Sequence, residues 1–234
     1  MSKTTPHPTL EVCCGSLDSA IVAAEAGAAR IELCTALEVD GLTPPAEWVD
    51  TLRSRYPQLL IHVLVRPRAG DFVYSEAEVS TMLHDIQQAA RVGASAIVSG
   101  AVTQGGEVDA AVTTRLVEAS GALPFTFHRA FDVLRDPFAT LPLLHRLGVR
   151  RVLTSGGAPT ADEGVAVLRR LVEQAAPLPL IILPGRGVNR HNVRHIIDTT
   201  GATEIHGSCS ATLPDGRRQT SADEVRAVLK SLAS

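Results

Sequence analysis

Eight short apolar segments alternate with helix-forming segments along this chain of 234 residues. The apolar segments are rich in branched aliphatic residues and end in polar or glycine-containing loops, as expected for buried strands of a parallel sheet. The expected strands are residues 10–14, 31–34, 59–65, 96–99, 125–127, 151–154, 180–183 and 204–206. This strict alternation predicts an α/β fold with helical crossovers between parallel strands.

Glycine and proline residues mark the boundaries of these units. A glycine ends the expected helix before every second strand, where a left-handed C-cap is favoured, and a proline shortly precedes each of the other strands. These residues are Gly27, Gly93, Gly148 and Gly201, and Pro8, Pro57, Pro124 and Pro179. Eight such units in a single domain over residues 1–234 predict a closed (β/α)8 TIM barrel. An open doubly wound sheet is the alternative, but its G-x-G-x-x-G motif is missing after residues 10–14.

Capping residues predict where several helices begin. Ser75 is followed three residues later by Glu78, which is the pattern of a capping box. Thr43 is the expected N-cap of a helix that runs to about residue 56, and Asn189 is the expected cap of the helix after residues 180–183. A further helix is expected from about Thr160.

The two ends of the chain and its charge limit its partners. Residues 1–8 are expected to form a polar tail, and residues 207–220 a mobile loop after the last strand. The net charge of −3 argues against nucleic-acid or membrane-surface binding. The chain has no apolar run of about 20 residues for a membrane span and no signal-peptide pattern. A cytoplasmic location is therefore expected, with the cysteines reduced.

Lysine is almost missing from the chain. Lys3 and Lys230 are the only lysines, and both lie near the ends. Enzymes that form a Schiff base need a lysine on the barrel, so this class of reaction has no candidate nucleophile. Nothing in the sequence indicates an organic cofactor.

Charged residues cluster at the expected carboxyl ends of strands, where barrel enzymes hold their active sites. Residues 125–132 carry His128, Arg129 and Asp132 directly after an apolar strand. We take Glu32, His128 and Asp132 as candidate acid/base residues, and Arg66 and Arg129 as candidates for holding an anion. The alternative is that these charges form only an ion-pair network that closes the barrel, because unpaired buried ions are costly.

Small residues end the later strands, which favours an anion site because glycine loops expose backbone N–H groups. The alternative is that the glycines merely turn the chain tightly. The candidate anion-binding residues in these loops are Ser155, Gly156, Gly185, Arg186, Gly187, His206 and Ser208.

Two cysteines end adjacent expected strands. Cys13 and Cys34 should lie on the same face of strands that are about 5 Å apart. Two thiolates in this arrangement suit a soft ion, above all copper(I), and we expect their sulfurs to lie within about 4 Å. The alternative is that they are buried small hydrophobes, as free cysteines often are. Cys14 should face the other way, and nothing in the sequence sets the direction of Cys209.

Seven motifs between residues 10 and 211 together resemble the CutC copper homeostasis family. They are Glu11–Cys13, Arg30–Cys34, Gly41–Pro44, Arg66–Phe72, Thr126–Asp132, Val152–Gly156 and Glu204–His206. The resemblance implies a TIM barrel, a cytoplasmic protein, a homo-oligomer that is commonly a dimer, and copper(I) binding at Cys13 and Cys34. The chain departs from the pattern at Ala69, where a glycine is usual, at the extra Cys209, and in a shorter segment after the last strand.

Two function hypotheses follow. The first is a copper homeostasis protein that binds copper(I) through Cys13 and Cys34. The second is an enzyme that uses acid/base chemistry on a small anionic substrate, which could carry a phosphate group, held by Arg66 and Arg129.

Overall fold

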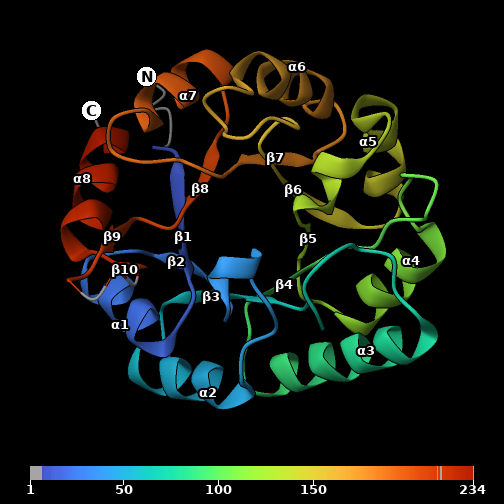
Figure 1. Cartoon of the computed structure of the whole chain (residues 1–234), viewed down its shortest axis with the longest axis horizontal. Helices are drawn as coiled ribbons and strands as arrows, with labels where there is room; N and C mark the ends of the chain where they lie inside the picture. The colour runs from blue at the N-terminus through green and yellow to red at the C-terminus, as the bar shows by residue number, and fades with distance from the viewer. Residues whose placement is uncertain (1–6, 215, 217, 234) are drawn as a thin grey trace, which may run out of the picture.

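Eight parallel strands form a barrel in the computed structural model, which describes residues 7–214, 216 and 218–233 (Figure 1). The strands are β1 (Thr9–Cys14), β2 (Arg30–Leu33), β3 (Leu60–Leu64), β4 (Ala96–Ser99), β5 (Phe125–Phe127), β6 (Val149–Thr154), β7 (Ile181–Pro184) and β8 (Glu204–Gly207). They pair in the order β7-β6-β5-β4-β3-β2-β1-β8, and β7 and β8 lie side by side where the ring meets. The predicted TIM barrel is confirmed.

Eight α-helices surround the strands (Figure 1). They are α1 (Leu17–Glu25), α2 (Ala46–Arg55), α3 (Glu76–Arg91), α4 (Ala110–Ala119), α5 (Pro137–Arg146), α6 (Val165–Ala175), α7 (Val193–Thr200) and α8 (Ala222–Ala233). The capping box predicted from Ser75 and Glu78 is present at the start of α3. Among the described residues, no helix combines the length and apolar character that crossing a membrane requires.

Three helices begin later than predicted, because the expected capping residues bond elsewhere. The Thr43 hydroxyl bonds to the backbone of Arg66 after β3, and α2 starts only at Ala46. The Asn189 side chain accepts from the N–H of His191 in a turn before α7, which delays that helix to residue 193. Thr160 likewise belongs to a turn, and α6 begins at residue 165.

The segment 207–220, expected to be a mobile loop, contains an antiparallel pair of short strands. These are β9 (Ser210–Thr212) and β10 (Arg218–Thr220). Residues 215 and 217 within it, and residues 1–6 of the expected polar tail, lie outside the described part of the chain.

Two 3₁₀ helices lie at the carboxyl end of the barrel: η1 (Leu37–Val39) after β2 and η2 (Arg129–Val133) after β5. η1 is the short light-blue turn that projects over the middle of the ring in Figure 1. Ala36 and Asp40 on either side of it both have positive φ angles, 51° and 66°, which are uncommon for residues other than glycine.

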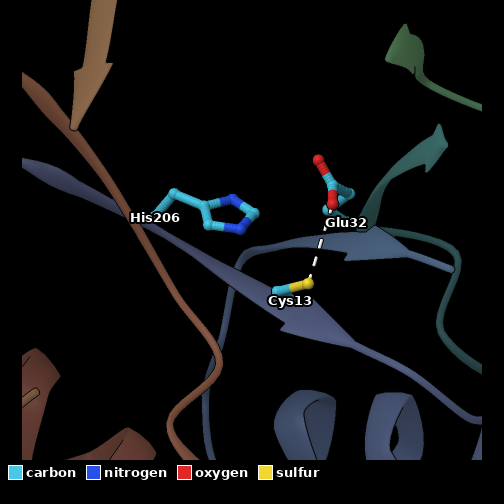
Figure 2. Close-up of side chains that lie close together, drawn as sticks. All are labelled: Cys13, Glu32 and His206. Carbon is cyan, nitrogen blue, oxygen red and sulfur yellow. Dashed lines mark hydrogen bonds between the residues drawn. The ribbon is translucent and has the colours of Figure 1, made fainter. Parts of the chain in front are cut away.

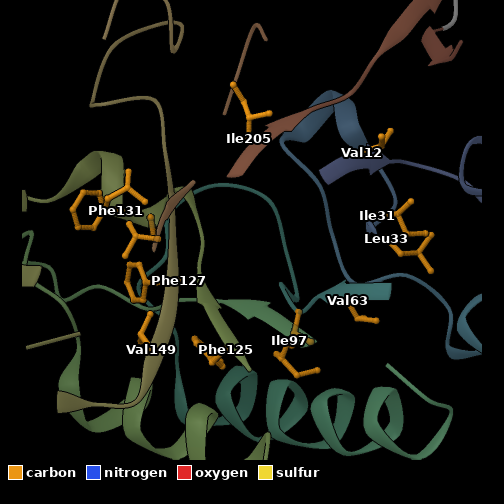
Figure 3. Close-up of a cluster of buried hydrophobic side chains, with 14 of the residues drawn as sticks. Val12, Ile31, Leu33, Val63, Ile97, Phe125, Phe127, Phe131, Val149 and Ile205 are labelled. Atoms are coloured by element: carbon orange, nitrogen blue, oxygen red, sulfur yellow. The ribbon is translucent and has the colours of Figure 1, made fainter. Parts of the chain in front are cut away.

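The apolar core lies between the barrel and its helices. Outward-facing residues such as Val12, Ile31 and Phe127 are fully buried there (Figure 3). Burying a side chain of this size contributes about 1.5–3 kcal/mol. The apolar cluster inside the barrel is small, consisting of Cys13, Cys34, Leu64 and Val98. The helices therefore stabilise the barrel by packing on its outer face, and most of the barrel interior is occupied by polar groups.

Candidate metal site and ligand cavity

A chain of ion pairs fills the amino-terminal part of the barrel interior. Arg151 on β6 binds Glu204 on β8 at 2.7 Å, and Glu204 binds Arg30 on β2 at 2.6 Å. Arg30 in turn binds Glu11 on β1 at 2.9 Å. Glu11 also contacts His62 Nδ1 on β3, at 2.6 Å. We call these five residues the charge ladder.

The charge ladder confirms that buried charges of this barrel pair with one another. Glu11, Arg30 and Glu204 each lie in a motif noted in the sequence, whereas Arg151 does not. Burial opposes ionisation of Glu11, but His62, His206 and Arg30 outweigh it and hold the pKa of Glu11 well below its usual range. His62 on β3 is buried in the barrel interior beside Glu11.

Cys13 and Cys34 lie directly above this ladder. Cys13 pairs in register with Glu32, and Cys34, which directly follows β2 and lies two residues after Glu32, is on the same face. Their Sγ atoms are 3.9 Å apart, which confirms the predicted separation. Cys34 is fully buried, and Cys13 is 7% exposed. Cys14 faces the helices, as expected, and its thiol donates to the carbonyl of Val12.

Glu32 and His206 complete a cluster around Cys13 (Figure 2). One ligand atom from each of Cys13, Glu32 and His206 lies within 4.8 Å of the other two. The side chains come from β1, β2 and β8 and converge from three sides in Figure 2, and the Cys13 thiol donates to Glu32 Oε1 at 3.6 Å. The sequence had assigned His206 to an anion site, whereas the structure places it among candidate metal ligands.

Glu11 orients His206 from below. Glu11 Oε1 accepts a hydrogen bond from His206 Nδ1 at 2.9 Å. This bond leaves Nε2 as the ring nitrogen available to a metal, in the carboxylate–histidine arrangement common around metal ions. Burial alone disfavours a protonated His206, but the charge of Glu32 and the contacts with Cys13 and Glu11 raise its pKa well above the usual range.

The thiols and Glu32 are shifted toward their protonated forms. The contact with Cys34, followed by burial, raises the pKa of Cys13 well above the ordinary value. Burial raises the pKa of Glu32 to about 7, with His206 acting against this rise and Glu11 adding to it. A metal ion that binds here must therefore displace protons.

A cavity of about 1170 Å³ opens above this cluster at the carboxyl end of the barrel. The five residues expected to share one pocket do so, since Glu32, Arg66, His128, Arg129 and Asp132 all line it. The other predicted residues along it are Cys13, Arg186, Gly187, His206 and Ser208. Four predicted residues are not part of its lining: Cys34, Ser155, Gly156 and Gly185.

His128 is held as a neutral ring. Its Nδ1 accepts from the N–H of Ala130 at 3.2 Å, so the proton of the neutral ring is on Nε2. Burial, together with the charges of Arg66 and Arg129, lowers the pKa of His128 to about 3. His128 Nε2 is buried and has no hydrogen-bond partner among the described residues.

Asp132 occupies the glycine loop in which an anion was expected. Its carboxylate accepts from the N–H groups of Ser155 and Gly157, both at 3.1 Å, and from the hydroxyl of Thr154. It also pairs with Arg129 Nε at 3.1 Å. The backbone donors of this loop therefore serve an internal carboxylate, and Asp132 has a structural partner at each of its oxygens.

Arg66 and Arg129 hold the loops around the cavity. The Nη atoms of Arg66 donate to the carbonyls of Val39, Gly41 and Gly70 at 2.7–3.0 Å. Arg129 Nη1 reaches Asp40 at 3.4 Å, next to η1. Both arginines were expected to bind an anion, but the Nη atoms of Arg66 donate to backbone carbonyls. The η1 turn above the mouth was not predicted from the sequence.

The loop after β7 places Arg186 at the cavity. A Cβ atom at Gly185 would lie 2.6 Å from the Leu153 side chain, so a larger residue there would have to displace Leu153. Arg186 itself has a φ of +83°, and Gly187 one of +74°. Arg186 makes no side-chain hydrogen bond or ion pair to the described residues.

Comparison with known proteins agrees with this geometry. The model of the CutC family matches residues 8–211. A CutC family protein from Glaesserella parasuis is 43% identical over 216 residues, covering 92% of this chain and 86% of that protein. The human copper homeostasis protein cutC homolog is 41% identical over 209 residues, covering 89% of this chain and 76% of that protein.

A solved structure of a CutC protein from Streptococcus agalactiae is also similar. It is 30% identical in sequence and superposes with a TM-score of 0.81, covering 86% of this chain and 98% of that one. The family match extends over all eight barrel strands and most of the surrounding helices. This chain belongs to the CutC family of copper homeostasis proteins.

Proposed function

We propose that this protein binds copper(I) through the thiolates of Cys13 and Cys34, with His206 Nε2 as a third ligand. The observation that carries the proposal is the 3.9 Å separation of the two sulfurs. Metal–sulfur bonds of about 2.3 Å, the length typical of zinc thiolate sites, allow one ion to touch both sulfurs at this separation.

The donor set favours copper(I) over harder ions. Thiolates are soft ligands, and they select copper(I) over the metals that prefer carboxylates. Glu32 is then better suited to accept a thiol proton than to bind the ion, because its pKa is raised to about 7. Glu11 supports the site from outside by orienting His206.

The family match supports a role in copper homeostasis. We place this role in the cytoplasm, where thiols stay reduced without a metal. We also expect a homodimer, on the family resemblance; light scattering of the purified protein measures its molecular mass.

Anaerobic titration with copper(I) against a competing chelator tests the proposal. Cys13→Ser and Cys34→Ser should each weaken copper(I) binding by more than about a hundredfold. Losing a residue that only orients a metal ligand already weakens binding by up to about a hundredfold, and losing the ligand itself should weaken it further. Cys14→Ser is the matched control, since Cys14 is equally buried on β1 but faces the helices. Tight binding that survives in the Cys13→Ser/Cys34→Ser double variant would refute the assignment.

A second candidate function is acid/base catalysis on a small anionic substrate. The specific observation in its favour is that Glu32 Oε2 and His128 Nε2 are both buried without hydrogen-bond partners and both residues line the cavity. Glu32 would accept a proton and neutral His128 would donate a hydrogen bond to the substrate oxygen. Asp132, the third residue predicted for this role, is engaged by the loop after β6.

Proton exchange in D2O tests this candidate. Small carbonyl compounds that carry a carboxylate or phosphate should incorporate deuterium with the wild-type protein, and Glu32→Gln should abolish the exchange. A wild-type protein that exchanges no proton of any such compound contradicts it.

A further inference from the structure

The thiol pair lies where a protein copper carrier has no access to it. Cys34 is fully buried, and Cys13 contacts the cavity from its inner end. η1 projects over the mouth, and Arg66 ties its backbone down through Val39. Copper(I) transfer between proteins needs an accessible thiol on each side, so copper must reach Cys13 on a molecule that fits into the cavity.

The cavity is large enough for such a molecule. Its volume of about 1170 Å³ is close to the 300–1,000 Å³ that is typical of pockets for small organic ligands. A bare ion bound to two sulfurs and one nitrogen would leave most of this space empty.

Several hydrogen-bond donors around the cavity have no partner among the described residues, in addition to the acceptor Glu32 Oε2. Arg186 brings a cation that has no ion pair among the described residues. The backbone N–H groups of Arg186, Gly187 and Val188 donate to no group in the described part of the chain. All three residues line the cavity, so the corner formed by the loop after β7 offers several donors to one ligand.

A second, independent donor lies on the other side of the cavity. The His128 ring lines it, is 4% exposed, and carries its proton on the unpartnered Nε2. A buried donor without a partner destabilises the folded state, and a hydrogen bond to a ligand oxygen would remove this cost. Donors on two walls predict a ligand with oxygen acceptors, that is, with carboxylate groups.

We infer that the cavity receives copper(I) as a complex with a small thiol that carries carboxylate groups, held by Arg186, the adjoining N–H groups and His128. This inference rests on the proposed copper(I) function and adds the chemical class of the copper donor. The carboxylates bind the donor groups, and the carrier's sulfur–copper unit then lies near Cys13.

Copper passes to the protein by ligand exchange. The Cys13 sulfur forms a bond to copper(I), its proton goes to the departing carrier thiolate, and that carrier leaves with its thiol protonated. Cys34 repeats the step with the second carrier thiolate. Two copper–sulfur bonds form and two break, two protons move from protein to carrier, and copper stays in the +1 state throughout.

Anaerobic stopped-flow transfer from two preformed copper(I) complexes tests the inference. The anionic carrier is mercaptosuccinate, and the neutral carrier is 2-mercaptoethanol. We expect transfer from mercaptosuccinate to be at least about tenfold faster, since each 1.4 kcal/mol of docking energy gives a factor of ten. Arg186→Ala and His128→Phe should bring the ratio of the two transfer rates close to one.

The matched control is Arg91→Ala. Arg91 is an exposed arginine in the last turn of α3, at the amino end of the barrel, so its loss changes net charge equally. Equal rates for the two carriers in the wild type, or an equal slowing in Arg91→Ala and Arg186→Ala, would overturn the inference.

A copper-free measurement separates this inference from the copper function. Succinate should raise the melting temperature of the wild type and of the Cys13→Ser/Cys34→Ser double variant, because it binds the folded state. Arg186→Ala should lose the shift. If the double variant keeps the succinate shift but the wild type does not bind copper(I) in the chelator titration, copper binding is refuted and the docking site is not. No succinate shift in the wild type refutes the docking site itself.

Discussion

The two ends of the barrel interior treat buried polar groups in opposite ways. At the amino end, each member of the charge ladder has an ion-pair partner at 2.6–2.9 Å. At the carboxyl end, Glu32 Oε2 and His128 Nε2 have none among the described residues. The neighbouring thiols of Cys13 and Cys34 contact mainly one another and Glu32. The difference separates charges that hold the barrel together from groups that are kept available for a ligand.

The ladder itself should be the most sensitive point of the fold. Arg30→Met leaves Glu11 and Glu204 facing each other without their shared cation, and removing one partner of a buried pair costs about 3–5 kcal/mol. Urea unfolding at pH 7 measures the loss. Arg150→Met is the control, because Arg150 is exposed on β6 and its side chain donates to the Pro179 carbonyl. A loss below about 1 kcal/mol would break the proposed division between the two ends.

Asp132 sharpens the comparison, because it lies at the open end and yet is fully bonded. Asp132→Ala leaves the N–H groups of Ser155 and Gly157 without their acceptor, and it should destabilise the protein by about 2–3 kcal/mol. Added acetate should restore part of the stability by occupying the vacated position. Urea unfolding with and without acetate tests this; chloride at equal ionic strength is the control, and equal rescue by both salts would contradict it.

Replacing Glu32 should raise the stability of the protein, whereas the two substitutions above lower it. Its pKa is raised to about 7 by burial, so the folded state binds its proton more tightly than the unfolded chain does. Its contribution to stability is therefore present at low pH and is lost as the pH rises through 7. Glu32→Gln should stabilise the protein by about 1–2 kcal/mol at pH 8 and by much less at pH 5. Urea unfolding at both pH values checks this, and a destabilised variant at pH 8 would count against it.

Glu204 gives the smallest of these effects. Burial opposes its ionisation, but Arg151 and Arg30 prevail and lower its pKa. The folded state then binds this proton less tightly than the unfolded chain, so stability is full above the ordinary value and falls as the pH drops below it. Between pH 6 and 4 we expect a loss of about 1 kcal/mol. Arg151→Met should flatten this dependence, and an unchanged slope would show that the pair does not contribute to it.

Much of the fold was open to prediction, because it depends on local patterns. Apolar runs, capping residues and the alternation of side chains placed the strands and brought Cys13 and Cys34 together. Glycine-rich loops drew attention to the carboxyl end, where the cavity lies. These features need only neighbouring residues and the known geometry of parallel strands.

The features that escaped prediction depend on contacts between distant segments. Arg30 and Glu204 are 174 positions apart, so only the register of β1, β2 and β8 reveals their pairing. Asp132 fills a loop 22–25 residues further on, and this occupant could not be distinguished in the sequence from a bound anion. Local pattern shows where polar groups gather, and register decides which of them are left unpaired.

The seam of the barrel has a mechanical consequence. The hydrogen-bonded order of the described strands starts at β7 and ends at β8, so these neighbours lack the backbone pairing that joins the other strands. The loop that forms the Arg186 corner follows β7, at one edge of this seam. The thiol pair spans β1 and β2, which are joined by continuous pairing. A ring of this kind is stiffer on the side that holds the two sulfurs and more compliant at the seam beside the Arg186 corner.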